Sequence, residues 1–450
     1  MTPGADELCV FAIKRGEVEK RCDVRFNRHQ LSTNTGARSA MLGTLCLYEP
    51  NYGMSSTAIE RTERKQPKYI RITDFTDNGI EDGHTFTTVA EYLPKHILND
   101  GDILFARSGA TVGKTYCHDS ALGLAVFAGY CIRFVIDPSK AVPKYVYWYT
   151  KTKKYSDWVQ KFQRPSAQPN INKEEYKSLE IILPPQDEQF RLVSEMNVAF
   201  QRRAAKLREA DELLAGMDEY VCSALGVTMP TFTPRLGVAV TMEQVKADRA
   251  FNVEYYNVER TTIIDTIKTV PHKRLGDCAV FMRDIVSATD DWYLGLAGVQ
   301  SNTGELSGTD EEATGQAFAF CEGDVLYCRL RPYLNKIWKA ERSGVCSTEF
   351  HVIRMKSNDV LSDYLAAVMR SQLILRQTRH MMTGNTHPRI GNEDVANLLI
   401  PVPSKDVQRK IADEMKARQD TARAKRSEAE AEWAMAKARF EQELLGGMDK

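Results

Sequence analysis

Two stretches of the chain carry apolar residues at the seven-residue spacing of a long helical seam. In the first stretch the positions that keep this spacing are Val193, Phe200, Leu207, Leu214 and Val221. The second stretch has a leaner stripe, formed by Met415, Ala422, Ala429 and Ala436. Large residues on one helix and alanines on the other suit close packing, so the pattern predicts an intramolecular antiparallel coiled coil. The alternatives are two separate surface helices or a coiled coil with another chain. About forty residues would make a rod of roughly 60 Å.

The two helical stretches are copies of one another. Residues that recur at a constant offset of 219 positions are Ile171/Ile390, Glu174/Glu393, Leu179/Leu398, Pro184/Pro403 and Gln189/Gln408. Each copy reads as a strand, a proline break and a long polar helix that stops at a glycine, Gly226 or Gly446. Proline fits the entry to a helix and glycine its exit.

The segments before the helices are duplicated as well, with more divergence. Gly101-Asp102 matches Gly323-Asp324 at an offset of 222, and each pair predicts a turn followed by a strand. The stretch 143–161 carries aromatic residues that predict a helix with a core-facing side. The expected fold class is therefore α+β: two mixed α/β globular domains joined by two long antiparallel coiled-coil helices, with an internal pseudo-two-fold duplication.

These patterns divide the chain into six segments. The predicted segments are a lead-in over 1–20, a first globular domain over 21–180, a long helix over 181–226, a linker over 227–245, a second globular domain over 246–399 and a second long helix over 400–450. The linker is expected because its first part, 227–237, is rich in threonine and proline and ends at a glycine.

Composition narrows the class of protein. The 450 residues are 43% apolar and 27% charged, which is ordinary for a soluble globular protein. No apolar run reaches membrane-spanning length, and the first residues do not resemble a signal peptide. The ten cysteines form no C-x-x-C pair, so we expect reduced thiols, a cytoplasmic location and no structural metal. The formal net charge is zero, yet the segment 61–71 is locally basic.

Catalytic signatures are missing from the sequence. The run from Gly109 to Thr115 falls short of a phosphate-binding loop, because Ser108 stands where that loop needs glycine. No G-x-G-x-x-G follows a strand, and no H-E-x-x-H occurs. We therefore expect no catalytic residue and no metal ligand, and interpret His351 and His387 as structural or binding residues.

With no catalytic signature in the sequence, the candidate functional residues are those suited to binding. Arginine and lysine residues on loops after equivalent strands are candidate DNA contacts, since arginine suits phosphate and guanine and lysine acts as a point charge. They are Arg107, Lys114, Arg329, Arg331 and Lys336. Polar residues that could read base edges or hold phosphates are Ser108, Gln168, Asn170, His387 and Arg389. The alternative is that these residues are solvated loop charges and turn formers.

The order of the motifs resembles a known family. The segments that carry the resemblance are Gly101 to Leu104, Arg107 to Gly109, Gln168 to Ile171, Leu183 to Pro185, Glu188-Gln189, Arg329 to Lys336 and Ser347 to Phe350, together with the paired long helices. In this order, and twice over, they resemble the specificity subunit of Type I restriction–modification systems. In the second copy His387 stands where the pattern has glutamine, and Val402 interrupts the pair of prolines.

The resemblance implies two target recognition domains that each read one half of a bipartite double-stranded DNA sequence, with the coiled coil setting the gap. It implies two methyltransferase subunits as partners, which methylate adenine after base flipping, and a restriction–translocation subunit as a further partner. S-adenosylmethionine, ATP and Mg²⁺ are then expected to bind the partner subunits, and this chain is expected to bind no cofactor. The resemblance also implies that this chain is a non-catalytic subunit of a complex that acts in phage defence. Two other readings stay open: a coiled-coil adaptor that bridges two proteins without binding DNA, and a cryptic nuclease or methyltransferase.

Overall fold

The computed structural model describes residues 39–80, 83–162, 169–233, 239–248, 253–287, 292–308, 311, 315–384 and 386–446. The chain divides into two units. The first draws on Met1–Ala204 and Ala429–Lys450, and the second on Ala205–Glu428. The division runs through both long helices, so the domain boundaries expected from the sequence stay predictions.

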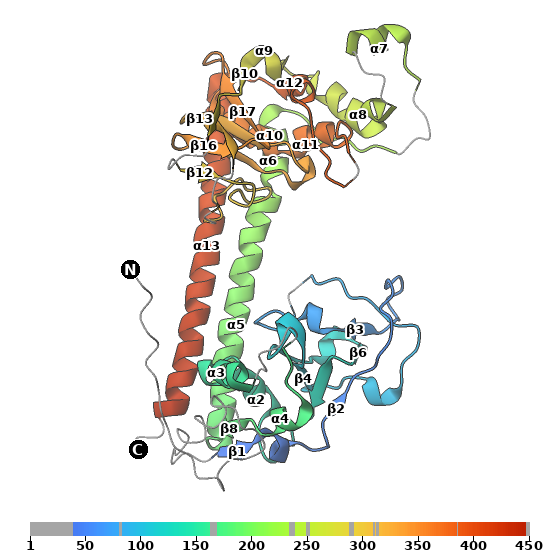
Figure 1. The fold of residues 1–450 in the computed structure, drawn as a ribbon, viewed down its shortest axis with the longest axis vertical. Helices are drawn as coiled ribbons and strands as arrows, with labels where there is room; N and C mark the ends of the chain where they lie inside the picture. The colour runs from blue at the N-terminus through green and yellow to red at the C-terminus, as the bar shows by residue number, and fades with distance from the viewer. Residues whose placement is uncertain are drawn as a thin grey trace. The chain divides into compact units, whose positions relative to one another are not determined.

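A four-stranded antiparallel sheet forms the centre of the first unit (Figure 1). Its order is β2 (Asn51–Tyr52), β7 (Cys131–Phe134), β4 (Ile103–Ala106) and β5 (Thr115–Cys117). Every residue of β4 is buried, as expected of a central strand. Two smaller ladders flank it: β3 (Lys68–Ile70) parallel to β6 (Ala125–Phe127), and β1 (Ser39–Met41) antiparallel to β8 (Glu180–Ile182). Short 3-10 helices connect them: η2 (Leu42–Leu45), η3 (Ile72–Asp74), η4 (Pro94–His96), η5 (Gly109–Thr111) and η6 (Ser120–Leu122).

The aromatic helix predicted over 143–161 is two helices, α2 (Pro143–Tyr149) and α3 (Lys153–Phe162). The break follows from the two threonines between them. Thr150 and Thr152 donate their hydroxyls to the carbonyls of Tyr147 and Tyr149, at 2.7 and 2.8 Å. The aromatic side chains of both helices enter the core, as predicted, and a further helix, α4 (Lys173–Lys177), follows.

The second unit repeats this plan. Its antiparallel sheet has the order β10 (Ala279–Met282), β17 (Phe350–Met355), β14 (Val325–Cys328) and β15 (Ile337–Lys339). The other ladders are β9 (His272–Arg274) with β18 (Leu399–Pro401), and a sheet ordered β11 (Ile285–Ser287), β13 (Gln316–Phe320), β16 (Gly344–Ser347) and β12 (Tyr293–Leu294). The helices that match α2, α3 and α4 are α10 (Ser362–Arg370), α11 (Gln372–Arg379) and α12 (Asn392–Ala396). Further helices are α7 (Met242–Asp248), α8 (Val258–Ile267), α9 (Leu275–Cys278), η7 (Val253–Tyr256) and η8 (Pro332–Leu334).

The first long helix is interrupted once, which the sequence pattern did not predict. Helix α5 (Gln186–Ala215) ends before Gly216, and α6 (Met217–Leu225) continues to Gly226. Gly226 adopts a left-handed conformation with φ of +71°, the usual glycine termination of a helix. The second long helix, α13 (Lys405–Gly446), runs without a break.

The long helices pack in opposite directions within each unit. In the first unit Arg203 pairs with Glu430 at 2.6 Å, and Arg191 pairs with Glu443. In the second unit the partners are Lys206 with Glu428, Glu209 with Lys425 and Gly216 with Arg418. Partner numbers fall on α13 as they rise on α5, so the pairing is antiparallel.

The predicted seam residues lie along this contact. Val193, Val221, Met415, Ala422 and Ala429 are buried. Phe200, Leu207, Leu214 and Ala436 are half-buried, and Phe200, Leu214 and Ala436 pack against the cores.

The duplication holds at the level of single hydrogen bonds. The Tyr145 hydroxyl donates to the Ile182 carbonyl at 2.6 Å, and the Tyr364 hydroxyl donates to Pro401 at 2.8 Å. The Gln189 side chain accepts from the Val142 N–H at 2.9 Å, and further matched bonds follow the same offset. The predicted fold class is therefore confirmed. None of the described helices combines the length and apolar character that a membrane span requires.

Candidate nucleic-acid interface

A pair of loop segments joined by backbone hydrogen bonds lies at the end of β4 in the first unit. The Arg107 carbonyl accepts from the Ile171 N–H at 2.9 Å, and the Gly109 N–H donates to the Pro169 carbonyl at 3.0 Å. Between them, Ser108 and Asn170 form an antiparallel bridge. The first predicted loop and the second predicted loop, about sixty positions apart in sequence, therefore form one frame, which we call the loop frame of the first unit (residues 107–109 and 169–171).

The second unit has the same frame at the end of β14. The Arg329 carbonyl accepts from Ile390 at 3.1 Å, and the Arg331 N–H donates to the Pro388 carbonyl at 2.7 Å. Leu330 and Arg389 form the matching bridge. We call residues 329–331 and 388–390 the loop frame of the second unit. The sequence predicted four separate loops, and the structure brings them together as two equivalent pairs.

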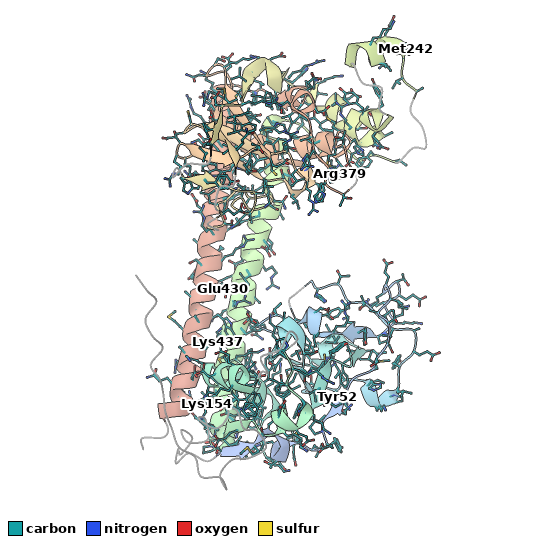
Figure 2. All side chains as sticks on the ribbon, in the orientation of Figure 1. Tyr52, Lys154, Met242, Arg379, Glu430 and Lys437 are labelled. Atoms are coloured by element: carbon teal, nitrogen blue, oxygen red, sulfur yellow. The ribbon has the colours of Figure 1, made fainter. Side chains whose placement is uncertain are left out.

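In the first unit the frame carries an arginine packed on an aromatic ring. The Arg107 guanidinium lies 4.9 Å from the centre of the Tyr52 ring, and Figure 2 labels Tyr52. The Arg107 Nε atom is buried and has no hydrogen-bond partner in the described residues. The Arg107 N–H donates to the carbonyl of Tyr130, whose side chain is 59% exposed. A guanidinium packed on a tyrosine ring has the elements of a base-stacking or phosphate-binding surface.

The other predicted DNA contacts of the first unit are buried, half-buried or paired within the protein, or lie outside the described residues. Ser108 is buried, and Asn170 is half-buried. Lys114 forms a 3.2 Å ion pair with Asp77. Gln168 lies outside the described residues. The glycine-rich run leads into strand β5 and not into a helix, which agrees with its failure to match a phosphate-binding loop.

In the second unit the frame is rich in charge. Arg389 donates to both carboxylate oxygens of Glu349, with Nη2 to Oε1 at 2.7 Å and Nε to Oε2 at 3.1 Å. The hydrogen bonds to Glu349 raise the pKa of Arg389. The Arg329 Nε atom lies 3.8 Å from the same carboxylate and makes no hydrogen bond in the described residues. Glu349 therefore serves two arginines at once.

Arg331 is the exposed arginine of this frame. Its backbone is left-handed, with φ of +48°, a region in which a side chain costs about 1–2 kcal/mol relative to a helical conformation. In the described part of the chain, its guanidinium has neither an ion pair nor a hydrogen bond. Backbone strain of this kind is concentrated at binding sites, so the conformation sets Arg331 apart from the other candidates.

The remaining predicted DNA contacts of the second unit, His387 and Lys336, differ in how freely they could contact a ligand. His387 is exposed, and its carbonyl accepts from Arg389 Nη1 at 3.4 Å. The Lys336 ammonium donates to the Leu296 carbonyl at 2.7 Å, which ties it to the protein.

The buried side chain of His351 contacts the backbone of the loop frame in the second unit. It is 3% exposed, and its Nε2 lies 3.1 Å from the Ile390 carbonyl, which makes Nε2 the donor. Burial lowers the pKa of His351 to about 4. The imidazole is therefore neutral near pH 7, in agreement with the structural alternative predicted for it.

Three residues that contact the frames were not singled out from the sequence: Tyr52, Tyr130 and Glu349. Tyr130 and Glu349 occupy the same place, because their carbonyls accept from Arg107 and Arg329 at 3.0 and 2.9 Å. The signal that could have found Tyr130 and Glu349 is the offset of 219 positions, which relates 130 to 349 as it relates the helices.

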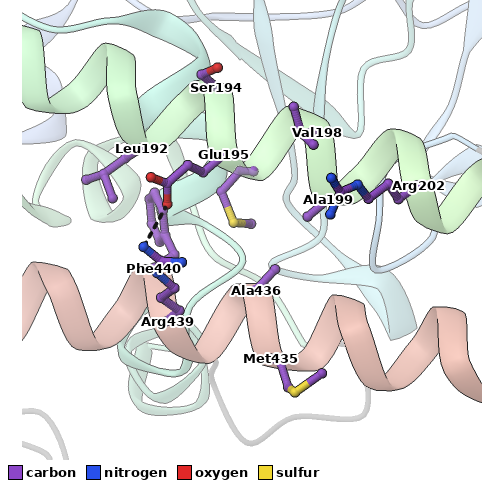
Figure 3. Close-up of a pocket in the computed structure, with 11 residues that line it drawn as sticks. Leu192, Ser194, Glu195, Val198, Ala199, Arg202, Met435, Ala436, Arg439 and Phe440 are labelled. Carbon is purple, nitrogen blue, oxygen red and sulfur yellow. Dashed lines mark ion pairs between the residues drawn. The ribbon is translucent and has the colours of Figure 1, made fainter.

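A separate groove lies between α5 and α13 in the first unit (Figure 3). It has a volume of about 490 Å³. Its lining is largely apolar and includes Leu192, Val198, Met435 and Phe440, with Met435 64% exposed. Among the described residues, no group of three or more His, Cys, Asp or Glu side chains could hold a metal ion.

Comparison with known proteins places this arrangement in a class. The family model of the Type I restriction modification DNA specificity domain matches residues 50–201 and 330–431, which together exceed half of the chain. The chain therefore belongs to this family. The two matched segments include the loop frame of the first unit and all of the second frame except Arg329.

Individual relatives are distant. The specificity subunit of the Type I restriction enzyme EcoDI from Escherichia coli is 20% identical over 305 residues, which are 63% of this chain and 64% of that subunit. The match thus spans less than two-thirds of that relative. A solved S subunit of a Type-I restriction-modification system from M. genitalium is 12% identical, with a TM-score of 0.48, over 92% of this chain and 96% of its own. The HsdS subunit from Thermoanaerobacter tengcongensis is 15% identical, with a TM-score of 0.36, over the same shares.

Proposed function

We propose that this chain is the DNA-recognition subunit of a Type I restriction–modification complex, and that each unit reads one half of a bipartite target in double-stranded DNA. The observation that carries the proposal is the repeated loop frame. The same pair of backbone hydrogen bonds occurs in both units of a chain whose family is the DNA specificity domain. In each frame an arginine stands where it could meet phosphate or a base edge.

The two frames differ in their side chains, which favours an asymmetric target. The first offers Arg107 on the Tyr52 ring, and the second offers an exposed Arg331 together with the ion pair of Arg389 and Glu349. A shared backbone with different side chains suits two half-sites of different sequence. On one face of B-DNA such half-sites would lie about one helical turn apart, ~34 Å, a span that a rod of roughly 60 Å could accommodate.

The catalytic reactions are assigned to partner subunits. We assign adenine methylation to two methyltransferase subunits, with S-adenosylmethionine, and DNA cleavage to a restriction subunit, with ATP and Mg²⁺. The chain itself is then non-catalytic. A cytoplasmic site of action agrees with the cysteines that the structure describes, which are free thiols.

The groove between α5 and α13 is the surface we assign to a methyltransferase subunit. Exposed apolar side chains in the lining of a groove, here Met435 and Val198, are typical of a protein contact. Met435→Lys is expected to lower the amount of methyltransferase that co-purifies with the chain. Unchanged co-purification would exclude the groove from the contact.

DNA binding is tested with the chain purified together with its methyltransferase subunits. The affinity for long duplex DNA is measured by fluorescence anisotropy between about 50 and 200 mM salt, a range over which contacts to six or more phosphates cost on the order of 10³-fold. Such a fall is the result expected of a DNA-recognition subunit. An affinity for protein partners without salt-dependent DNA binding would support the adaptor alternative instead.

A further inference from the structure

We propose that Glu349 is a specificity-determining positioning residue of the second unit: it immobilises Arg389, and the immobilised loop presents Arg331 to one half of the DNA target. This inference rests on the proposed function and deepens it. It also reassigns Arg389, which the sequence pattern predicted as a DNA contact, to a role within the protein.

The donors of Arg389 are committed to protein acceptors. Nε and Nη2 meet the two oxygens of Glu349 at 2.7 to 3.1 Å, and Nη1 lies 3.4 Å from the His387 carbonyl. A bidentate pair of arginine and carboxylate fixes orientation as well as distance. Arg389 thus closes the turn between 387 and 389 and is not available to grip a base edge with both faces of its fork.

The fixed turn holds the backbone of Arg331. Pro388, the neighbour of Arg389, accepts the Arg331 N–H at 2.7 Å. Leu334 N–H in turn donates to the Arg331 carbonyl at 2.9 Å. Both backbone groups of Arg331 are therefore bonded while its side chain is exposed and unpaired in the described residues. The left-handed conformation at φ of +48° persists because these two bonds impose it.

The first unit shows what the same frame looks like without this device. Tyr130 occupies the place of Glu349, as their matched carbonyl bonds to Arg107 and Arg329 show. At the offsets of the repeat, Asn170 stands for Arg389 and Gly109 stands for Arg331. Gly109 has the same left-handed backbone, with φ of +75°. The pair of Glu349 and Arg389 and the projecting Arg331 thus occur together in one unit and are replaced together in the other.

The carboxylate also has an electrostatic effect that a merely structural group would lack. A negative charge at a DNA-facing loop opposes phosphate binding at any sequence, so it lowers non-specific affinity. Glu349 neutralises Arg389, whereas the Arg331 guanidinium has no partner among the described residues and is free to respond to the base sequence. The consequence is a higher ratio of specific to non-specific binding in the second half-site.

The test uses the complex of the full chain with its methyltransferase subunits and three duplexes: its own mapped target, and the target substituted in the first or in the second half. Glu349→Gln keeps the side-chain shape and removes the charge. We expect its preference for the intact target over the duplex substituted in the second half to fall about tenfold, since a charged hydrogen-bond partner is lost. Affinity for the substituted duplexes should rise, and preference at the first half should not change. Glu322→Gln, an exposed carboxylate of the same unit, is the matched control and should match the unsubstituted chain.

Two further variants keep the test independent of folding. The double variant Glu349→Gln/Arg389→Gln removes both members of the bidentate pair and leaves Arg329 without the carboxylate that lies 3.8 Å from its Nε. We expect its slope of log affinity against log salt to be no smaller than that of the unsubstituted chain, because Arg389 touches no phosphate. Arg331→Ala should reduce that slope by about one if its contact is to phosphate, or abolish second-half preference at constant slope if it is to a base.

The possible outcomes distinguish a failure of the proposed function from a failure of the role proposed for Glu349. An unsubstituted complex with no sequence preference would overturn the proposed function. An unsubstituted complex with a bipartite target, and a Glu349→Gln variant that discriminates the second half equally well, would overturn only the role of Glu349. A lower salt slope in the double variant would show that Arg389 contacts DNA and would also overturn it.

Discussion

Trp433 donates a 2.8 Å hydrogen bond from its indole Nε1 to the side-chain oxygen of Asn78, a residue 355 positions earlier in the chain. Trp433 is 1% exposed and packs against Trp148 and Phe200. The core of the first unit is therefore completed by the end of the helix that belongs to the second copy of the repeat. In the second unit, Val221 from the first copy takes part in the core in the corresponding way.

This arrangement predicts that shortening the Trp433 side chain lowers the stability of the first unit alone. Trp433→Ala should cost about 3–5 kcal/mol, the range for a large buried aromatic residue. Hydrogen exchange of α2 amides in the first unit should speed up, while α10 in the second unit keeps its protection. Met435→Ala, an exposed position on the same helix, is the control and should stay within about 0.5 kcal/mol. Equal loss in both units would contradict the assignment of Trp433 to the first core.

Arg331→Ala is expected to weaken recognition of one half-site only. The reason is that Arg331 projects from the frame of the second unit, whereas the first has Gly109 at that place. A contact to a base edge is worth about 1–3 kcal/mol of discrimination. The measurement is competition between duplexes substituted in either half. Equal loss at both halves, or no loss, would count against the role of this residue.

Removal of one heptad from each long helix should shorten the spacer between the half-sites. Residues 203–209 and 425–431 form a suitable pair, because their ion pairs Arg203–Glu430, Lys206–Glu428 and Glu209–Lys425 disappear together. Seven residues correspond to ~10 Å of helix, or about three base pairs. Methylated sequences of the variant complex would reveal the new spacer. A variant that methylates with the original spacing would remove the helices from their proposed role as a ruler.

His351 makes the second unit sensitive to mild acid. Its folded pKa, about 4, lies below the ordinary value of 6.5. Between these values the unfolded chain binds a proton that the folded unit does not, so unfolding becomes easier as the pH falls from 6.5 towards 4. The loss amounts to ~3 kcal/mol by pH 4.

His351→Gln cannot titrate and can still donate a hydrogen bond to the Ile390 carbonyl. Its thermal midpoint should therefore fall less than that of the unsubstituted chain between pH 7.5 and pH 5. Because only the difference between the two proteins is compared, other histidines cancel. Parallel falls in both proteins would show that His351 is not responsible.

Local sequence patterns were enough to predict the duplication, the antiparallel helices and the strands. Heptad spacing and the offset of 219 positions are properties of nearby residues and of matched copies. The breaks at Gly216 and at Thr150 to Thr152 escaped prediction. The break between α2 and α3 is made by side-chain hydroxyls that bond back to the preceding turn, a choice that a helical period does not record.

The candidate interface was predicted in its parts and not in its arrangement. Arg107, Arg329 and Arg331 were predicted as DNA contacts from their residue type and their place after a strand, and they stay predictions. That Glu349 would hold Arg389, 40 positions later, depends on the pairing of two loops across the sheet. No local pattern specifies such a contact, so the second role of Arg389 emerged only from the structure. Glu349 and Tyr130 were missed for the same reason.

The most direct test of DNA recognition is a genome-wide map of N6-methyladenine in a host that carries this gene and its methyltransferase partner, compared with the same host lacking only this gene. The account predicts a split sequence motif with a fixed gap that is present in the first host and absent from the second. An identical map in both hosts, with the complex shown to be expressed, would contradict it.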